Sequence, residues 1–125
     1  MMGERRDDRG GNPLVPDGSG ADLSLNAILE VMAHHHRREI LRVLVDSPDH
    51  TASIDELMNH VSDLEVARTG QRPGRDQLEI AFHHVHLPAL TDVGLLEYDA
   101  RSKDVRYRRH ERVEDLLEYL DSISE

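Results

Sequence analysis

The sequence predicts a mostly α-helical fold with a small β hairpin, of the α+β class. Apolar residues recur at helical spacing through the first half of the chain. A further helical pattern over residues 75–90 is followed by Gly94 and by two short β-like segments joined by a polar turn. An amphipathic pattern over residues 113–123 then predicts a last helix.

The composition fits one small domain and excludes several classes of protein. The chain has 125 residues and no cysteine. This absence excludes disulfides, thiolate metal sites and a cysteine nucleophile, and it fits the reducing cytoplasm in which we expect the protein. No apolar run approaches the roughly 20 residues that a membrane span needs, so we expect no membrane partner.

The charge balance is acidic, with 25 acids against 15 bases and a net charge of −10. Only Lys103 is a lysine, and the other bases are arginines. This composition resembles that of proteins from salt-loving archaea. A net negative charge normally opposes a polyanionic partner. At molar salt the Debye length falls to about 3 Å, so local contacts decide instead.

Residues 1–22 contain few apolar side chains, and we expect a disordered tail because little burial can offset the ordering entropy. Three arginines in the tail could form an arm that touches DNA, but the acids beside them cancel their charge. We therefore favour a solvated leader. The domain proper is expected over residues 23–125.

The first half predicts two supporting helices. The first has two parts: Asp22 or Ser24 can cap a short helix to about Met32, and either a bend or a continuation leads into a main helix to about Val45. Ser53 and Glu56 have the spacing of a capping box and open the second helix after a short extended link. The apolar face of that helix ends at Val61, and residues 62–74 are expected to form a long polar connection. The alternative is that residues 65–68 add a turn of helix.

The second half predicts a helix, a hairpin and a final helix. The helix over residues 75–90 is apolar around most of its circumference, and Pro88 predicts a kink. Residues 95–99 and 105–109 form the hairpin. The final helix packs on the first helix of its own chain or seals a dimer. A helix, a glycine stop and a hairpin are typical of a winged helix-turn-helix, here with an added C-terminal helix. The expected core comprises Leu41, Leu44, Ile54, Leu57, Val61, Leu87, Leu90 and Leu95.

The strongest functional signal is basic charge on the hairpin. Residues 101–112 contain six bases and two acids. Arginine gives bidentate contacts to phosphate oxygens, so the hairpin is predicted to bind the DNA backbone. The structural alternative is an edge strand guarded by charge. The predicted phosphate contacts are Arg101, Lys103, Arg106 and Arg108.

Base reading is assigned to the helix over residues 75–90, which we expect to lie in the major groove. Arginine, glutamine and histidine can hydrogen-bond base edges. The predicted contacts are Arg75, Gln77 and His83. Against this, the turns where a reading helix should be polar contain Ile80, Ala81, Phe82 and Val85. The alternative is that some of these residues face the core or a partner subunit.

Neither a metal site nor catalysis is expected. Nine histidines include the clusters His34–His36 and His83–His86, but there is no cysteine and no H-E-x-x-H pattern. Histidines on an apolar stripe are more often core or interface residues. We therefore expect no metal ligands and no cofactor. No G-x-S-x-G motif and no phosphate-binding glycine loop is present, so we expect no enzyme.

Two segments resemble those of known regulators. The stretch HVHLPALTDVGLLEYD, residues 84–99, resembles the H-L-x-x-L-x-x-x-G-L-[IV] signature of ArsR-type winged-helix regulators. The run RREILRVLVDSP is similar to their R-x-x-I-L-x-x-L segment. Residues 27–115 most resemble haloarchaeal winged-helix domain proteins. The resemblance implies a homodimeric transcriptional regulator that binds double-stranded DNA. The metal-sensing cysteine motif is absent, so metal sensing is not implied.

The sequence thus predicts a DNA-binding transcriptional regulator, and the structure can distinguish this function from one alternative. The alternative is a winged-helix module that binds proteins through its apolar helix. Exposure of both Phe82 and Val85 on a flat patch would favour the protein-interaction module. Their burial in the core or a dimer seam would favour DNA binding.

Overall fold

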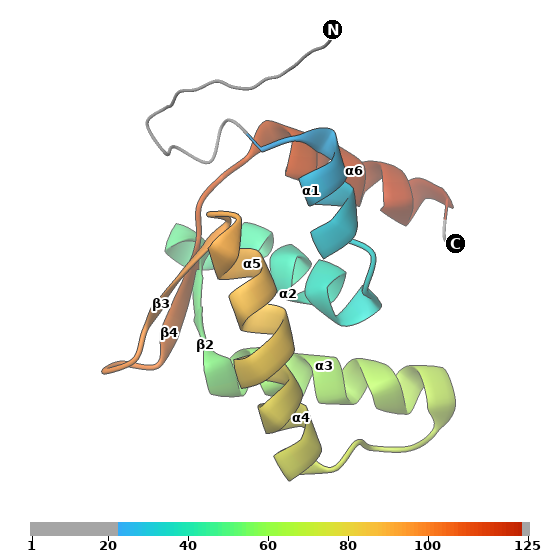
Figure 1. The fold of residues 1–125 in the computed structure, drawn as a ribbon. Helices are drawn as coiled ribbons and strands as arrows, with labels where there is room; N and C mark the ends of the chain where they lie inside the picture. Colours follow the sequence, from blue (N-terminus) through green and yellow to red (C-terminus); the bar gives the residue numbers. More distant parts are fainter. Residues whose placement is uncertain (1–22, 124–125) are drawn as a thin grey trace, which may run out of the picture.

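The computed structural model describes residues 23–123, so the predicted tail lies outside the described residues. This part is mostly helical with one three-stranded antiparallel sheet (Figure 1). None of its helices is long and apolar enough to cross a membrane. The elements are α1 (Leu25–Val31), α2 (His35–Asp46), η2 (Pro48–His50), β2 (Thr51–Ser53), α3 (Ile54–Thr69), α4 (Arg75–Ala81), η3 (Phe82–His86), α5 (Leu87–Asp92), β3 (Leu96–Asp99), β4 (Asp104–Tyr107) and α6 (Glu111–Ile123).

The predicted short helix and main helix are present as α1 and α2, and Ser24, one of the two predicted caps, starts the first of them. The Ser24 hydroxyl accepts from the Ala27 backbone N–H at 3.1 Å and starts α1. After a bend, the imidazole of His34 caps α2 by accepting from the His36 backbone N–H at 3.1 Å. Of the two alternatives for this junction, a bend and a continuation, the structure has the bend, and it lies next to the histidine run.

The start of α3 was predicted correctly, but its end was not. Ser53 and Glu56 form both hydrogen bonds of the capping box, each 3.0 Å long. The helix then continues eight residues beyond the predicted end at Val61 and stops at Gly70, whose φ is +80°. Polar residues after Val61 read as a loop, yet polar residues are equally suited to the exposed side of a helix. The connection to α4 is therefore only residues 70–74.

The predicted third helix runs from α4 through η3 to α5 and ends at Asp92, slightly beyond the expected residue 90. Its irregularity lies just before Pro88, where a kink was expected. Residues 82–86 form a π-helical turn, and the Leu87 N–H reaches back to the Phe82 carbonyl. Proline has no N–H to donate, and the wider turn accommodates the interrupted hydrogen-bond ladder.

The sheet has the strand order β2–β4–β3, and both pairs are antiparallel. The predicted hairpin is confirmed as β3 and β4, and the short link before α3 adds β2 to it. Val105 and Tyr107 on β4 are buried, whereas Arg106 between them is exposed. The alternation gives the sheet one core face and one solvent face.

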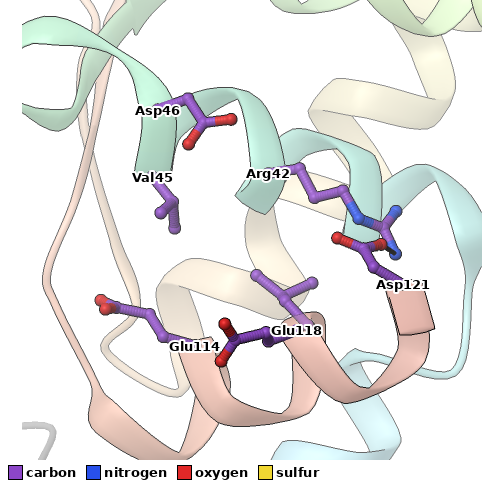
Figure 2. A pocket seen from close by; sticks show the side chains of 7 residues that line it. Arg42, Val45, Asp46, Glu114, Glu118 and Asp121 are labelled. Carbon is purple, nitrogen blue, oxygen red and sulfur yellow. Dashed lines mark ion pairs between the residues drawn. The ribbon is translucent and has the colours of Figure 1, made fainter.

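All eight predicted core residues are buried, none being more than 4% exposed. The core also includes Phe82 from η3 and Val113 and Leu117 from α6. Thus α6 packs against its own chain, on α2, which was one of the two predicted alternatives. Figure 2 shows this contact, where Arg42 of α2 forms a 2.6 Å ion pair with Asp121 of α6.

A hydrogen-bonded group fixes the start of α6 to the end of β4. The buried Tyr107 hydroxyl donates to Glu114 Oε2 and accepts from the His110 N–H, both at 3.0 Å. Arg109 donates to both oxygens of the same carboxylate, at 2.9 and 3.2 Å. Hydrogen bonds from Arg109 are the main cause that lowers the pKa of Glu114 from its ordinary value of 4.5.

This geometry predicts that Glu114→Gln lowers stability at neutral pH and lowers it by less at a pH below 4.5. A lowered carboxyl pKa contributes stability that is present above pH 4.5 and is lost as the pH falls through the folded-state value. Urea unfolding at both pH values measures the difference from the unsubstituted protein. Glu118→Gln, an exposed carboxylate on the same helix, is the matched control. Equal pH dependence of the two variants would contradict the assignment.

Candidate nucleic-acid interface

The N-terminal end of α4 exposes two of the predicted base contacts, Arg75 and Gln77. Arg75 is already engaged by α3, because its guanidinium donates to Asn59 Oδ1 at 2.9 Å and to Asp55 Oδ1 at 3.1 Å. Both partners in the Arg75–Asp55 ion pair are largely exposed, so solvent screens the attraction. Arg75 can exchange this carboxylate for another anion at little energetic cost.

The third predicted base contact, His83, lies where the helix meets the hairpin. Its ring packs edge-on against Tyr98 of β3, with 6.2 Å between the ring centroids. His83 is half-buried and Tyr98 is partly exposed. The pair therefore joins the helix to the hairpin, so the two form one continuous surface.

The exposed face of α4 is more acidic and more apolar than a polyanion-binding surface should be. A shallow groove of about 410 Å³ is lined by Asp76, Glu79, Ile80, His83 and His84. The two carboxylates oppose the approach of phosphate. Sequence analysis had weighed the apolar residues on this helix but not the acids that share their face.

Phe82 and Val85, which were to distinguish the two predicted functions, point to different environments. Phe82 is fully buried in the core, whereas Val85 is 49% exposed and Ile80 is 59% exposed. The condition for the protein-interaction module, exposure of both Phe82 and Val85, is not met. The exposed pair on this helix is Ile80 and Val85.

The hairpin carries three exposed bases, Arg101 and Lys103 at its tip and Arg106 on β4. No ion pair joins any of them to a carboxylate within residues 23–123. Asp99 orders the tip, because its side chain accepts from the Arg101 N–H at 2.9 Å and its carbonyl accepts from the Lys103 N–H at 2.7 Å. Arg106 lies on the central strand, so its charge is not explained by protection of a sheet edge.

The other predicted phosphate contact, Arg108, forms a 2.7 Å ion pair with Glu97 of β3. Glu97 also lies opposite Arg106 in the strand register. Counting charge along residues 101–112 missed Glu97 and Asp99, which the fold brings beside the bases. The basic surface is therefore smaller than the sequence indicated and comprises mainly Arg101, Lys103 and Arg106.

The groove between α2 and α6 has the opposite character (Figure 2). It has a volume of about 330 Å³, and its charged lining is one arginine and four acids. Arg42 is the arginine, and its ion pair with Asp121 neutralises one acid. This side of the molecule does not suit a polyanion. Glu114 is paired with Arg109, which leaves Asp46 and Glu118 as the other acids of the groove.

A second polar cluster lies between α2, α3 and η3, and sequence analysis did not find it. The rings of His34, His35 and His36 gather with that of His86, whose centroid is 4.5 Å from His34. Burial, with a smaller effect of the neighbouring charges, lowers the pKa of His86 to about 4. Hydrogen bonds from His35 and His36 lower the pKa of Glu65 to about 2. Only the spacing within His34–His36 was visible in the sequence.

Comparison with known proteins identifies one family. A family model described as a domain of unknown function, DUF7344, matches residues 29–106. The matched segment spans most of the fold from α1 to β4 and leaves α6 outside it. No curated protein and no solved structure gave a match. Because the family model covers more than half of the chain, this protein belongs to the DUF7344 family.

Proposed function

We propose that this chain is a winged helix-turn-helix transcriptional regulator that binds double-stranded DNA. In this proposal α3 and α4 are the helix-turn-helix and the β3–β4 hairpin is the wing. The hairpin projects from the helices, and both it and the start of α4 lie in the lower half of Figure 1, away from α1 and α6. The observation that carries the proposal is the group of exposed bases Arg101, Lys103 and Arg106 on that projecting hairpin.

The wing would supply most of the binding energy through phosphate contacts, which position a protein on DNA without reading its sequence. The start of α4 would approach the major groove with Arg75, Gln77 and His83. Asp76 and Glu79 restrict how closely that helix can approach phosphate. Arg75 would leave Asp55 when it meets a phosphate or a base. The proposal therefore predicts binding dominated by the wing, with limited base readout.

Two exposed apolar groups support the homodimer that the family resemblance implies. Leu25 and Leu29 on α1 are about half exposed, and Tyr119 and Ile123 on α6 are more so. Both helices lie in the upper part of Figure 1. Burial of these side chains against a second copy would remove apolar surface from water. The dimer would then place two wings on one duplex.

The wing assignment predicts the salt dependence of DNA binding. Arg101→Ala, Lys103→Ala and Arg106→Ala, combined in one variant, should reduce the slope of log affinity against log salt by about 3, close to 1 per lost phosphate contact. Fluorescence anisotropy with a labelled duplex over a range of potassium chloride concentrations measures it. The same titration gives the number of chains bound per duplex.

Arg112→Ala removes an exposed arginine outside the hairpin and is the control for charge alone. Glu97→Gln offers the reverse test, because it releases Arg108 from its ion pair and should tighten binding. Unchanged slopes in the triple variant would refute phosphate binding by the wing. A smaller slope in both the triple variant and Arg112→Ala would show a general charge effect instead.

The exposed Ile80 and Val85 favour a second candidate, a module that binds a protein through the face of α4. Asp76 and Glu79 on the same face would suit a basic, partly apolar partner surface. If the unsubstituted protein binds no duplex even at low salt, DNA binding is refuted and this candidate is the one that remains.

A further inference from the structure

Three polar side chains meet between the start of α2 and the C-terminal half of α3. His35 Nε2 lies 2.7 Å from Glu65 Oε2, and His36 Nε2 lies 2.8 Å from the same oxygen. His36 and Glu65 are about 15% exposed, and His35 is 37% exposed. The cluster is therefore set into the surface with one side open to solvent.

The convergence requires the tertiary packing of α2 on α3. Consecutive residues of a helix project about 100° apart, so two adjacent imidazoles do not normally meet at one point. Here Glu65 lies between them, and the three potential ligand atoms are all within 4.8 Å of one another. The cluster brings together residues 29 and 30 positions apart in the chain.

Two imidazole nitrogens and one carboxylate oxygen are a ligand set that zinc accepts, with a fourth position left for water. Ligand atoms on a tetrahedral zinc ion are about 3.4 Å apart, given metal–ligand bonds of about 2.0–2.2 Å. The observed separations would have to widen by roughly 0.6 Å, and the exposure of His35 leaves room for that shift. We propose that His35, His36 and Glu65 bind a divalent transition-metal ion of the zinc type.

Arg68 is the internal competitor for this site. Its Nη1 lies 3.1 Å from Glu65 Oε2 and 3.2 Å from His35 Nε2, so its positive charge lies where a metal ion would bind. The Arg68 side chain is 50% exposed and can turn into solvent. Metal binding must displace this charge, which predicts that removal of Arg68 strengthens binding.

A second group, His34, His36 and His86, also brings its ligand atoms within 4.8 Å of one another and shares His36. It suits a metal less well, because the His34 Nδ1 atom accepts the hydrogen bond that caps α2. His86 is only 3% exposed, and Arg37 lies 3.4 Å from its Nδ1. The set with Glu65 supplies a negative charge and an open side, so it is the one proposed.

The test uses the full chain without an affinity tag. Cobalt(II) titration, followed by its visible d–d absorption, and competition by zinc(II) measure stoichiometry and affinity. One ion per chain is expected. Glu65→Gln should weaken binding more than about tenfold, because it removes the only charged ligand, and Arg68→Ala should strengthen it. Zinc should also raise the thermal midpoint of the unsubstituted protein more than that of Glu65→Gln.

The matched control is His34→Ser, which removes one imidazole of the histidine run but keeps a residue able to cap α2. It should bind metal as the unsubstituted protein does. Equal affinity in Glu65→Gln, with a native circular dichroism spectrum, would show adventitious binding to a histidine run and overturn the proposal. Loss of binding in His34→Ser would assign the metal to His34, His36 and His86 and also overturn the proposed ligands.

Discussion

Replacement of Phe82 with alanine should lower the free energy of unfolding by about 3–5 kcal/mol. Phe82 is the only phenylalanine in the chain, and it is fully buried on the π-helical turn. Its ring packs edge-on near His86, with 6.1 Å between centroids. Truncation would leave a cavity between the third helix and the core. Since small domains are stable by only about 5–15 kcal/mol, this loss would be a large part of the total.

Urea unfolding measures the change, and two variants serve as controls. Phe82→Leu keeps most of the apolar volume and should cost less than about 1.5 kcal/mol. Val85→Ala removes an exposed apolar side chain from the same turn and should change stability by about 0.5 kcal/mol or less. If Phe82→Ala lowered the free energy of unfolding no more than Val85→Ala does, Phe82 would not be a core residue and the helix would present another face to the core.

The architecture was predictable because its signals are local in the sequence. The apolar period, the Ser53–Glu56 capping box and the Gly94 stop each act over a few residues, and the helices, hairpin and core they predicted are present. The end of α3 was missed because polar residues fit a loop and an exposed helical face equally well. Pro88 indicated an irregular helix but not its form as a π-helical turn.

The polar contacts were less predictable because they depend on residues distant in the chain. Sequence analysis identified Arg75 and Arg108 as basic but not their partners Asp55 and Glu97. Glu65 and His86 lie far along the chain from the histidine run that they join. A run of three histidines alone does not reveal a carboxylate opposite it. A prediction that α3 extends past Val61 would have placed Glu65 on a helix that packs against α2, and this could have indicated the carboxylate.

Arg37 shows the same dependence on tertiary structure, and its replacement should have the second large effect on stability. It occupies the first position of the segment that resembles the ArsR-type R-x-x-I-L-x-x-L pattern, which said nothing of its contacts. In the structure its Nε donates to the Val31 carbonyl at 2.6 Å, and its Nη2 lies 3.4 Å from the Glu30 carbonyl. Carbonyls at a helix end lack partners within the helix. Arg37 thus ties the end of α1 to the start of α2.

Arg37→Met keeps much of the apolar stem but removes these donors, and it should cost about 1.5–3 kcal/mol, the range for hydrogen bonds to a charged group. Urea unfolding again measures the loss, and Arg112→Met is the control for replacement of an exposed arginine. Hydrogen exchange should also show faster opening of α1 in Arg37→Met, because the helix loses its tie to α2. Full stability together with unchanged exchange would mean that apolar packing of Ile28 and Val31 alone holds α1.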